Sequence, residues 1–365
     1  MKIVFVNSCG YFGGAEIWHL NTAIWMKERG HQVTIMARPG PLAERAQKAD
    51  IPVITVPMSF DLDLLSFVKA YAYFRQEKPD LVILNDQREC RLIAPAAMLA
   101  GVKVRVQRKA WPFLKGSWRD RLVYGKFVTH MFGSSEAVTE LFKEKSGLPP
   151  DRISLIPTGI DISGFTGEEK SESRDKLGLP RQAFIIGSVG RLVSQKAFDV
   201  LIRAASVLKE NGHEFMVAIA GEGPLEEGLR DLADKLGVRE AIKFMGFVED
   251  MPAFFSALDI YVSSSRMESR ARSMSEAMAA GLPIITTDAP GNDELVVKSG
   301  SGIVVPADAP QKLAEAVENF MTDSVLLERY GKNAKDYAVT ELDSKIIVEK
   351  LEQYLEGLLA DETGA

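Results

Sequence analysis

The sequence is poor in cysteine and histidine and has no long apolar run. Its 365 residues include only two cysteines, Cys9 and Cys90, too few for a disulfide framework. The four histidines are scattered, and no cysteine and histidine residues have the spacing of a zinc site. No stretch of about 18 apolar residues is present to span a bilayer, and the apolar run at residues 1–7 does not resemble a signal peptide. We therefore expect a cytoplasmic protein.

A surplus of positive charge is also missing. The chain carries 44 lysine and arginine residues against 50 aspartate and glutamate residues, a formal net charge of -6. Because nucleic acid is bound largely through its phosphates, this balance argues against a nucleic-acid partner. The composition, 46% apolar and 26% charged, is that of a globular protein and excludes a disordered or coiled-coil chain. The length corresponds to about two domains.

Short apolar segments alternate with longer helical segments along most of the chain. Residues 3–6 form the first apolar segment, and residues 15–29 follow a helical pattern that Gly30 ends. Strands that alternate with helices pair in parallel, because each crossover helix returns the chain to the same edge of the sheet. The pattern predicts an α/β fold with parallel sheets.

The alternation is interrupted once. Residues 157–173 are polar and rich in turn formers, and a second alternation begins with the apolar segment at residues 184–189. We predict two doubly wound, Rossmann-like domains at residues 1–165 and 166–340. A C-terminal helix in residues 341–365 is expected to cross back to the first domain. Such domains bind ligands at the carboxyl ends of their strands, in the crevice between them.

A glycine-rich turn follows the first apolar segment. Gly13 and Gly14 let a ligand approach the backbone, and the start of the next helix favours an anion. A tight strand-to-helix turn without a ligand is the alternative. Arg38 follows the second apolar segment, where a dinucleotide-binding domain needs an acidic residue. The sequence therefore disfavours simple NAD binding.

The corresponding turn of the second half carries two cations. Arg191 and Lys196 follow Gly190 and have the charge to neutralise a diphosphate leaving group without a metal ion. Two solvated surface cations are the alternative. Glu222 and Gly223 follow a later strand, where a nucleoside can lie against the glycine backbone. These turns predict a nucleotide site in the second domain.

Glu268 and Glu276 are separated by seven residues. The first lies in a loop after a predicted strand, and the second lies in the following helix. Carboxylates orient sugar and ribose hydroxyls well, because each accepts several hydrogen bonds. Acidic residues near the start of a helix are also common for structural reasons. Their position after the diphosphate-type turn favours the binding role.

With these motifs, the chain resembles the retaining glycosyltransferases of family four, which have the GT-B fold. The resemblance rests on residues 13–16, 30–33, 156–161, 190–196, 221–225 and 268–283. It implies two Rossmann-like domains facing a central cleft. It also implies transfer of a hexosyl group from a nucleoside-diphosphate sugar to an acceptor with retained anomeric configuration, and no cofactor.

The resemblance also implies roles for individual residues. Arg191 and Lys196 would bind the donor diphosphate, Glu268 a hydroxyl of the donor sugar, and Glu276 the ribose. Gly14 would lie beside the diphosphate from the opposite domain. We expect Glu268, Lys196 and Arg191 to carry the catalytic step.

The chain departs from the family pattern in two places. Arg108 and Lys109 lie where such enzymes often carry a histidine. Arg270, Ala271 and Arg272 replace a glycine-rich turn after Glu268, and their two cations suit an anionic donor or acceptor.

One pattern of a different transferase fold is also present. Asp61 and Asp63 mimic its metal-binding pair, but an apolar helix begins near Leu64, so we expect helix capping instead. No other carboxylate cluster suits a hard cation. We therefore predict no metal site and activity without a metal ion.

Residues 103–126 combine basic and aromatic side chains. The segment has eight cations and one acid, Asp120, and thus a local charge of +7. Its candidate acceptor-binding or membrane-binding residues are Arg108, Lys109, Trp111, Phe113, Lys115, Trp118 and Arg119. Such a mixture suits an anionic membrane surface, and we expect a peripheral enzyme that glycosylates a lipid-linked or envelope acceptor such as a lipopolysaccharide core. Alternatively, the cations bind a soluble phosphorylated acceptor and the aromatic residues pack in the core.

Two other functions share this architecture. A sugar-nucleotide epimerase would need no acceptor, and a sugar-nucleotide-binding protein would not turn over its ligand. The presence of Arg191, Lys196, Glu268 and Glu276 argues against a purely binding role.

Overall fold

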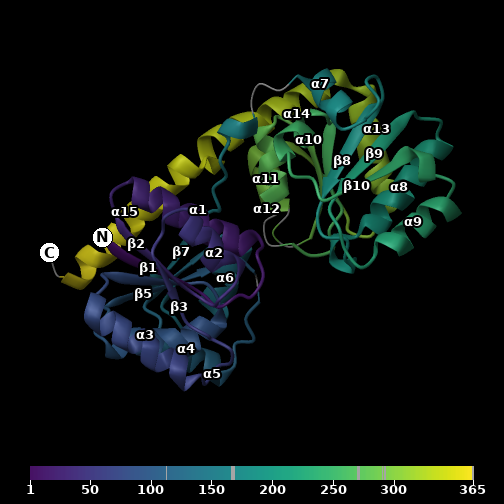
Figure 1. Ribbon diagram of the computed structural model, residues 1–365. Coiled ribbons are helices and arrows are strands. Elements are labelled where there is room, and N and C mark those ends of the chain that lie inside the picture. Colours follow the sequence, from purple (N-terminus) through teal and green to yellow (C-terminus); the bar gives the residue numbers. More distant parts are fainter. Residues whose placement is uncertain (112, 166–168, 269–271, 290, 292, 364–365) are drawn as a thin grey trace. The chain divides into compact units, whose positions relative to one another are not determined.

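The computed structural model describes the whole chain except residues 112, 166–168, 269–271, 290, 292 and 364–365 (Figure 1). The chain forms two compact units. Unit 1 contains Met1–Thr158 and Lys345–Ala365, and unit 2 contains Gly159–Ser344. Among the described residues, no helix is long and apolar enough to cross a membrane.

The division between the units falls at residue 158 and not at residue 165. Ile160 explains the difference, because its backbone N–H donates to the carbonyl of Leu342 and its carbonyl accepts from Ser344. Phe165 packs edge-on against Phe255, which also belongs to unit 2. These contacts place residues 159–165 in unit 2, inside the polar stretch where the sequence predicts the linker.

Unit 1 is built on a seven-stranded parallel sheet with the order β3-β2-β1-β4-β5-β6-β7. The strands are β1 (Lys2–Asn7), β2 (Gln32–Ala37), β3 (Val53–Thr55), β4 (Leu81–Leu84), β5 (Val104–Lys109), β6 (His130–Gly133) and β7 (Ile153–Leu155). The helices are α1 (Gly14–Glu28), α2 (Pro41–Lys48), α3 (Leu64–Glu77), α4 (Gln87–Leu99), α5 (Trp118–Lys126), α6 (Glu136–Lys145), the 3-10 turn η1 (Pro150–Arg152) and α15 (Ser344–Thr363). All its strand pairs are parallel, as the alternation predicts.

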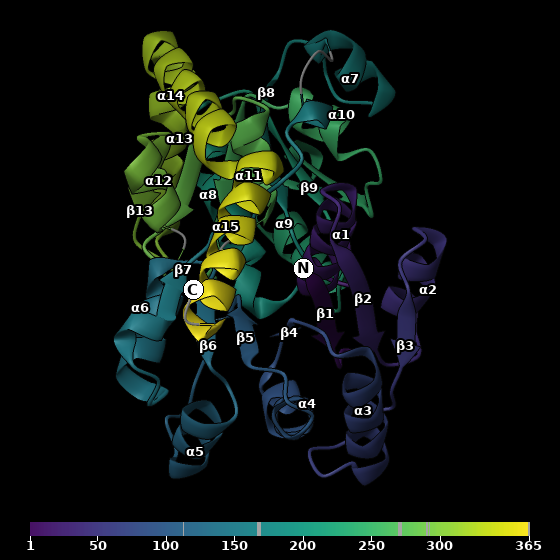
Figure 2. The same cartoon turned by 90° about the vertical axis from the view of Figure 1, so that its left-hand side faces the viewer.

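Helices cover both faces of this sheet. Val4 and Val6 of β1 face a core shared with α3, α4, α5 and α6, which include Phe74 and Phe142. Ile3 of the same strand faces a second core, shared with α1, α2 and α15. Figures 1 and 2 both show α3, α4 and α5 together on one face. The strand side chains alternate between two cores because successive residues of a strand point to opposite faces.

Unit 2 is built on a six-stranded parallel sheet with the order β10-β9-β8-β11-β12-β13. The strands are β8 (Phe184–Val189), β9 (Phe215–Ala220), β10 (Ile242–Gly246), β11 (Ile260–Ser263), β12 (Ile284–Thr287) and β13 (Gly302–Val305). The helices are α7 (Lys170–Lys176), α8 (Phe198–Glu210), α9 (Glu226–Lys235), α10 (Met251–Ser256), α11 (Arg272–Ala279), α12 (Asp293–Ser299), α13 (Pro310–Thr322) and α14 (Ser324–Tyr337). Shorter helical turns are η2 (Ser163–Phe165), η3 (Ser194–Lys196), η4 (Arg239–Ala241) and η5 (Ala338–Leu342).

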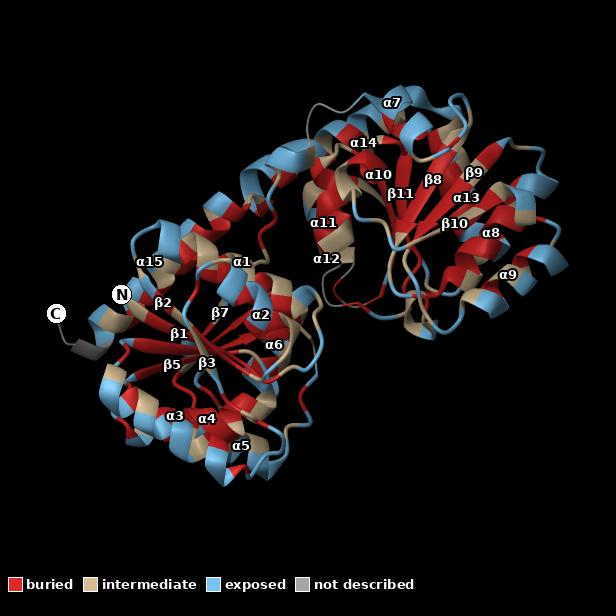
Figure 3. Ribbon diagram, in the orientation of Figure 1, coloured by how far each residue is buried: buried red, intermediate tan, exposed pale blue. Residues whose placement is uncertain are grey.

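The unit 2 sheet is also covered on both faces. One core contains residues of α8, α9 and α13, and the other contains residues of α10, α11, α12 and α14. Figure 3 shows the strands of both units as buried and the outer surfaces of their helices as exposed. Two doubly wound parallel sheets confirm the predicted α/β fold class.

Candidate active site

The loop after β8 carries the two predicted diphosphate-binding residues. Lys196 lies in η3, directly ahead of α8. A Cβ atom at Gly190 would lie 3.2 Å from side-chain carbons of Lys196, so the lysine stem lies along the glycine backbone. Arg191 is exposed and forms no ion pair with a described residue. The loop therefore holds one cation in place and leaves the other in solvent.

The structure brings Lys196 and Glu268 together. Lys196 Nζ donates to Glu268 Oε2 in an ion pair, although the two residues are 72 positions apart. Their loops follow β8 and β11, which are neighbours in the sheet. The Glu268 side chain is 9% exposed and that of Lys196 is 20% exposed, so the pair is largely withdrawn from water. The charge of each side chain is balanced by the other.

Arg266 is a residue that the sequence analysis missed. Its guanidinium forms ion pairs with Asp199 of α8 and with Asp308, and it donates to the carbonyl of Ser194 in η3. Its backbone N–H also donates to the carbonyl of Gln195. These contacts fasten η3 to the loop after β11, and so position Lys196 beside Glu268. The only sequence signal was its place two residues before Glu268.

Glu276 lies on α11 and is also paired. Its Oε1 accepts from Arg272 Nε at 2.7 Å, one helical turn away. Burial raises the pKa of Glu276, and Arg272 opposes that rise. Arg272 is thus the partner of Glu276, whereas Arg270 and Ala271 lie outside the described residues.

The glycines of the loop after β9 serve loop packing. A Cβ atom at Gly223 would lie 2.5 Å from the carbonyl oxygen of Leu192, and one at Gly221 would lie 2.0 Å from that of Gly190. Leu192 donates its N–H to the carbonyl of Glu222 at 2.9 Å. The close approach of these two backbones explains why both positions are glycine. The sequence predicts an exposed backbone at Gly223, but the backbone of Leu192 packs against the side of Gly223 where a Cβ atom would lie. The side chain of Glu222 is exposed.

In unit 1, the predicted anion-binding turn lies at the start of α1. Gly13 donates its N–H to Glu16 Oε2 at 3.1 Å, and Asn7 donates from its amide to Glu16 Oε1 at 3.1 Å. Glu16 is 2% exposed, and these two hydrogen bonds join the turn to the end of β1. Gly14 has open space where a Cβ atom would lie.

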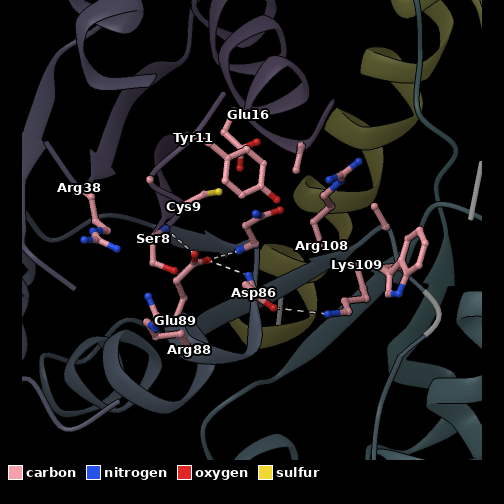
Figure 4. Close-up of a pocket in the computed structure, with 15 residues that line it drawn as sticks. Ser8, Cys9, Tyr11, Glu16, Arg38, Asp86, Arg88, Glu89, Arg108 and Lys109 are labelled. Atoms are coloured by element: carbon pink, nitrogen blue, oxygen red, sulfur yellow. Dashed lines mark hydrogen bonds and ion pairs between the residues drawn. The ribbon is translucent and has the colours of Figure 1, made fainter. Parts of the chain in front are cut away.

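A cavity of about 400 Å³ opens beside this turn (Figure 4). It lies at the carboxyl ends of β1, β2, β4 and β5, where doubly wound sheets bind ligands. Its lining residues are Ser8, Cys9, Gly10, Tyr11, Ala15, Glu16, Arg38, Asn85, Asp86, Arg88, Glu89, Arg108, Lys109, Ala110 and Trp111. Charged side chains of both signs thus surround one space within unit 1.

Glu89 is the most buried carboxyl of this cavity, and the sequence analysis missed it. It is fully buried and accepts backbone N–H bonds from Ser8 at 2.6 Å, from Asp86 at 2.9 Å and from Asn85. Burial raises the pKa of Glu89 from its ordinary value of 4.5 to about 7, against the opposing effect of the three N–H donors. Glu89 therefore joins the ends of β1 and β4 and titrates near neutral pH.

Arg108 and Lys109, which the sequence offers as acceptor-binding or membrane-binding residues, are buried in β5. They are 3% and 7% exposed, because β5 lies between β4 and β6 and is covered on both faces. The Arg108 guanidinium lies 4.5 Å from the centre of the Trp18 ring. Lys109 Nζ lies 3.5 Å from Asp86 Oδ1. Both residues, with Trp111, line the unit 1 cavity instead of the outer surface.

The remaining residues of the segment are on the surface. Phe113 is 53% exposed and Trp118, at the start of α5, is 71% exposed. Lys115 and Arg119 are exposed as well. The predicted set therefore splits into a cavity group and a surface group. The alternative in which these aromatic residues pack in the core is wrong for Phe113 and Trp118.

Asp61 and Asp63 have structural roles. Asp63 caps α3 by accepting the N–H of Ser66, as expected, and Asp61 forms ion pairs with Arg88 and Arg91. In the part of the chain that the structure describes, no three histidine, cysteine, aspartate or glutamate residues are grouped to hold a metal ion.

Two family models match the chain. The model described as glycosyl transferases group 1 matches residues 169–337, and the model described as glycosyltransferase family 4 matches residues 12–163. Each match falls largely within one of the two structural units.

Relatives matched over most of their length agree with these family models. The chain is 26% identical over 355 residues to the lipopolysaccharide core biosynthesis glycosyltransferase LpsE of Rhizobium meliloti, covering 95% of this chain and 96% of the relative. It is 26% identical over 315 residues to the UDP-Gal:alpha-D-GlcNAc-diphosphoundecaprenol alpha-1,3-galactosyltransferase of Escherichia coli, covering 82% and 81%. The solved structure of Anabaena Alr3699/HepE in complex with UDP matches with a TM-score of 0.88 at 22% identity, covering 98% of this chain and 100% of that one.

The fold and these matches define a glycosyltransferase with the GT-B fold. The chain belongs to the family-4-type glycosyltransferases, which confirms the resemblance carried by its sequence motifs.

Proposed function

We propose that this glycosyltransferase moves a hexosyl group from a nucleoside-diphosphate sugar to a glycan or lipid-linked acceptor, with retention of anomeric configuration and without a metal ion. The observation that carries the proposal is the Lys196–Glu268 pair at the carboxyl edge of the unit 2 sheet. A cation and a carboxylate side by side suit a phosphate and a sugar hydroxyl that are neighbours in one donor molecule. Solved neighbours in complex with UDP and with UDP-glucose support such a donor.

The donor site has distinct tasks for its charges. Lys196 and Arg191 neutralise the diphosphate as the glycosidic bond breaks, because fixed cations stabilise the charge that develops on the leaving group. Glu268 accepts a hydrogen bond from a hydroxyl of the donor sugar, and Glu276 accepts hydrogen bonds from the ribose hydroxyls. Donor binding therefore replaces the Lys196–Glu268 ion pair with a phosphate contact on one side and a hydroxyl contact on the other.

The direct test is a donor screen with uridine and guanosine diphosphate sugars that records release of nucleoside diphosphate. A labelled donor sugar that moves to a new molecule supports a transferase. Label that stays in an isomerised donor indicates an epimerase, and binding without turnover indicates a binding protein. The anomeric configuration of the product, read by NMR, tests retention.

The names of the relatives indicate the pathway. One is named for lipopolysaccharide core biosynthesis, and another acts on a diphosphoundecaprenol acceptor. We place the acceptor of this enzyme in the same class, an envelope glycan or its lipid-linked precursor. Such an acceptor lies at a membrane, and so the enzyme needs access to that surface.

The exposed residues of the 103–126 segment provide a membrane-binding surface. Trp118 and Leu122 of α5 are 71% and 51% exposed, and Phe113 is 53% exposed. The exposed cations around them are Lys115, Arg119, Arg121 and Lys126. Aromatic rings suit the headgroup depth of a bilayer, and each cation near anionic lipid contributes about 1 kcal/mol at most. We propose reversible attachment through this surface.

Sedimentation with vesicles tests this attachment. We expect binding that requires anionic lipid, weakens at high salt and falls in Lys115→Glu/Arg119→Glu. The matched control is Lys48→Glu/Lys235→Glu, which makes the same charge change at exposed lysines away from this segment. An absence of vesicle binding at low salt, together with full activity on a water-soluble acceptor, contradicts the attachment.

A further inference from the structure

The cavity of unit 1 holds a buried charge that the donor site does not explain. Arg108 is 3% exposed, and burial lowers its pKa to about 10. Its one hydrogen bond to a described residue is the 3.4 Å contact from Nη2 to Thr158 Oγ1. Its Nη1 atom is buried without a hydrogen-bond partner in the described structure. A guanidinium removed from water with unfilled donors is unfavourable unless a ligand supplies the acceptor.

Arg108 also has no ion pair with a described carboxylate. Glu16 acts on it electrostatically, but the two oxygens of Glu16 already accept from Gly13 and Asn7. The Arg108 guanidinium carbon lies 4.5 Å from the centre of the Trp18 ring, a cation–π contact that holds the guanidinium in place without filling its N–H donors. A planar guanidinium with unfilled N–H donors matches the paired oxygens of a phosphate or carboxylate.

Other cations line the same cavity. Arg38 is half-buried and forms no hydrogen bond or ion pair with a described residue. Lys109 Nζ forms one ion pair with a described residue, the 3.5 Å contact with Asp86 Oδ1. Figure 4 shows Arg38 on one side of the cavity and Arg108 with Lys109 on the other. The charge around the cavity is therefore not balanced by the pairs that its residues make.

Groups that suit a sugar ring are present as well. Asp86 is exposed enough to accept hydroxyl hydrogen bonds, with 60% of its side chain open to solvent. Tyr11, which is 72% exposed, and Trp111 present aromatic rings to the same space. Carboxylates accept hydrogen bonds from sugar hydroxyls, and aromatic rings offer an apolar face to the sugar ring.

We infer that the unit 1 cavity binds an acceptor sugar that carries an anionic group, a phosphate or a carboxylate, and that Arg108 is the residue that selects this group. The inference rests on the proposed transferase function only in naming the ligand an acceptor. The anion positions the sugar by accepting hydrogen bonds from the N–H groups of Arg108. Asp86 then orients the sugar by accepting hydrogen bonds from its hydroxyls. A neutral sugar would leave the N–H donors of the buried guanidinium without an anionic acceptor, and it should therefore bind more weakly.

Calorimetry on the full chain tests the inference with four probes: glucose 6-phosphate, glucuronate, glucose and inorganic phosphate. The background is Arg191→Ala/Lys196→Ala, which removes the cations of the unit 2 loop as a competing phosphate site. We expect at least one charged sugar to bind, with glucose at least about tenfold weaker, since loss of a hydrogen bond to a charged group is worth about 1.5–3 kcal/mol. The glucose 6-phosphate and glucuronate arms distinguish a phosphate from a carboxylate ligand.

Arg108→Gln is expected to weaken the charged probes about 10- to 100-fold and to leave the affinity for glucose unchanged. Arg108→Lys restores part of the affinity, because it retains the charge and loses the planar fork. Arg38→Gln, at a half-buried position, gives a second variant if Arg108→Gln does not fold. Lys48→Gln is the matched control, an exposed cation of α2 outside the cavity.

Three outcomes overturn the inference: none of the probes binds, glucose binds as tightly as the charged sugars, or Arg108→Gln and Arg38→Gln both bind like the background protein. Donor turnover is measured separately on the unmodified chain. If no donor is turned over while the charged sugars bind through Arg108, the proposed function fails and the anion site stands.

Discussion

In unit 2, four charged residues of the candidate donor site form two ion pairs, Lys196 with Glu268 and Arg272 with Glu276, while Arg191 is exposed. In unit 1, the cavity at the equivalent edge of the sheet contains Arg108, whose Nη1 atom has no described partner, and Arg38, which forms no described ion pair. Both sites lie at the carboxyl ends of parallel strands.

The difference indicates two ways of preparing a site for a charged ligand. A paired site is stable when empty, and its ligand has to exchange one partner for another. An unpaired site holds a desolvated charge in advance, and only a ligand of the opposite charge relieves it. We interpret the first as suited to a donor with both phosphates and hydroxyls, and the second as a filter for an anionic acceptor.

The largest expected effect concerns the paired site. Lys196→Ala removes a cation from the leaving diphosphate and should lower kcat at saturating donor by a factor corresponding to about 3 kcal/mol, or roughly 100-fold. Lys209→Ala, at an exposed lysine of α8, is the matched control. A Lys196→Ala enzyme with near-normal kcat would show that the pair has no part in the transition state.

The next largest effect is a pH dependence of stability caused by Glu89, which lines the unit 1 cavity. The raised pKa of Glu89 means that the folded chain binds more protons than the unfolded chain between about pH 4.5 and pH 7. Its contribution to stability is therefore present below pH 4.5 and is lost as pH rises toward 7, by up to about 3 kcal/mol. The Glu89→Gln side chain does not titrate, so this variant should lack that part of the pH dependence.

Denaturant unfolding of both proteins at a series of pH values measures this contribution. The difference between wild type and Glu89→Gln isolates Glu89 from other titrating groups, such as His19, whose pKa burial lowers to about 3. An unfolding free-energy difference that stays constant from pH 4.5 to pH 7 contradicts the titration of Glu89.

The two units also show how much of this molecule the sequence predicts. The α/β class and the position of the turns follow from local patterns, because apolar segments and glycines mark strands and turns directly. The close approach of Lys196 and Glu268 follows from placing both loops after strands of one parallel sheet. The burial of Arg108 does not follow, because residues 104–109 read as a polar, basic strand and only the strand order shows that β5 is central.

Glu89 and Arg266 were missed for a similar reason. Glu89 reads as an ordinary helix residue of α4, and its contacts with Ser8 and Asn85 depend on β1 and β4 being neighbours. Arg266 reads as a loop cation, and its partners Asp199 and Asp308 are far away in the sequence. Side chains that join distant segments become visible only when the sheet order is known.

A smaller effect, on the free energy of unfolding, tests the contrast between the paired site of unit 2 and the unpaired Arg108 of unit 1. Arg108→Met replaces a buried, unpaired charge with an apolar side chain of similar length, so the free energy of unfolding should stay the same or rise by about 1 kcal/mol. Lys196→Ala should lower it, because the largely buried Glu268 then loses its ion pair with Lys196. Urea unfolding of the two variants without ligand measures both. Equal losses of stability would remove the distinction between a paired and an unpaired site.

The smallest expected effect is that of a chelator on the rate, which should be none. If Lys196 and Arg191 neutralise the diphosphate, a divalent cation has no charge left to compensate, and the described residues offer no group of ligands to hold one. The measurement is the rate of nucleoside-diphosphate release before and after treatment with excess EDTA, with the Lys196→Ala variant assayed in parallel with and without added magnesium. A wild-type rate that collapses with EDTA and returns with magnesium or manganese would contradict metal independence. Rescue of Lys196→Ala by magnesium alone would instead show that a metal ion can replace the lysine, and would confirm that the charge of Lys196 is what the donor site contributes to the leaving group.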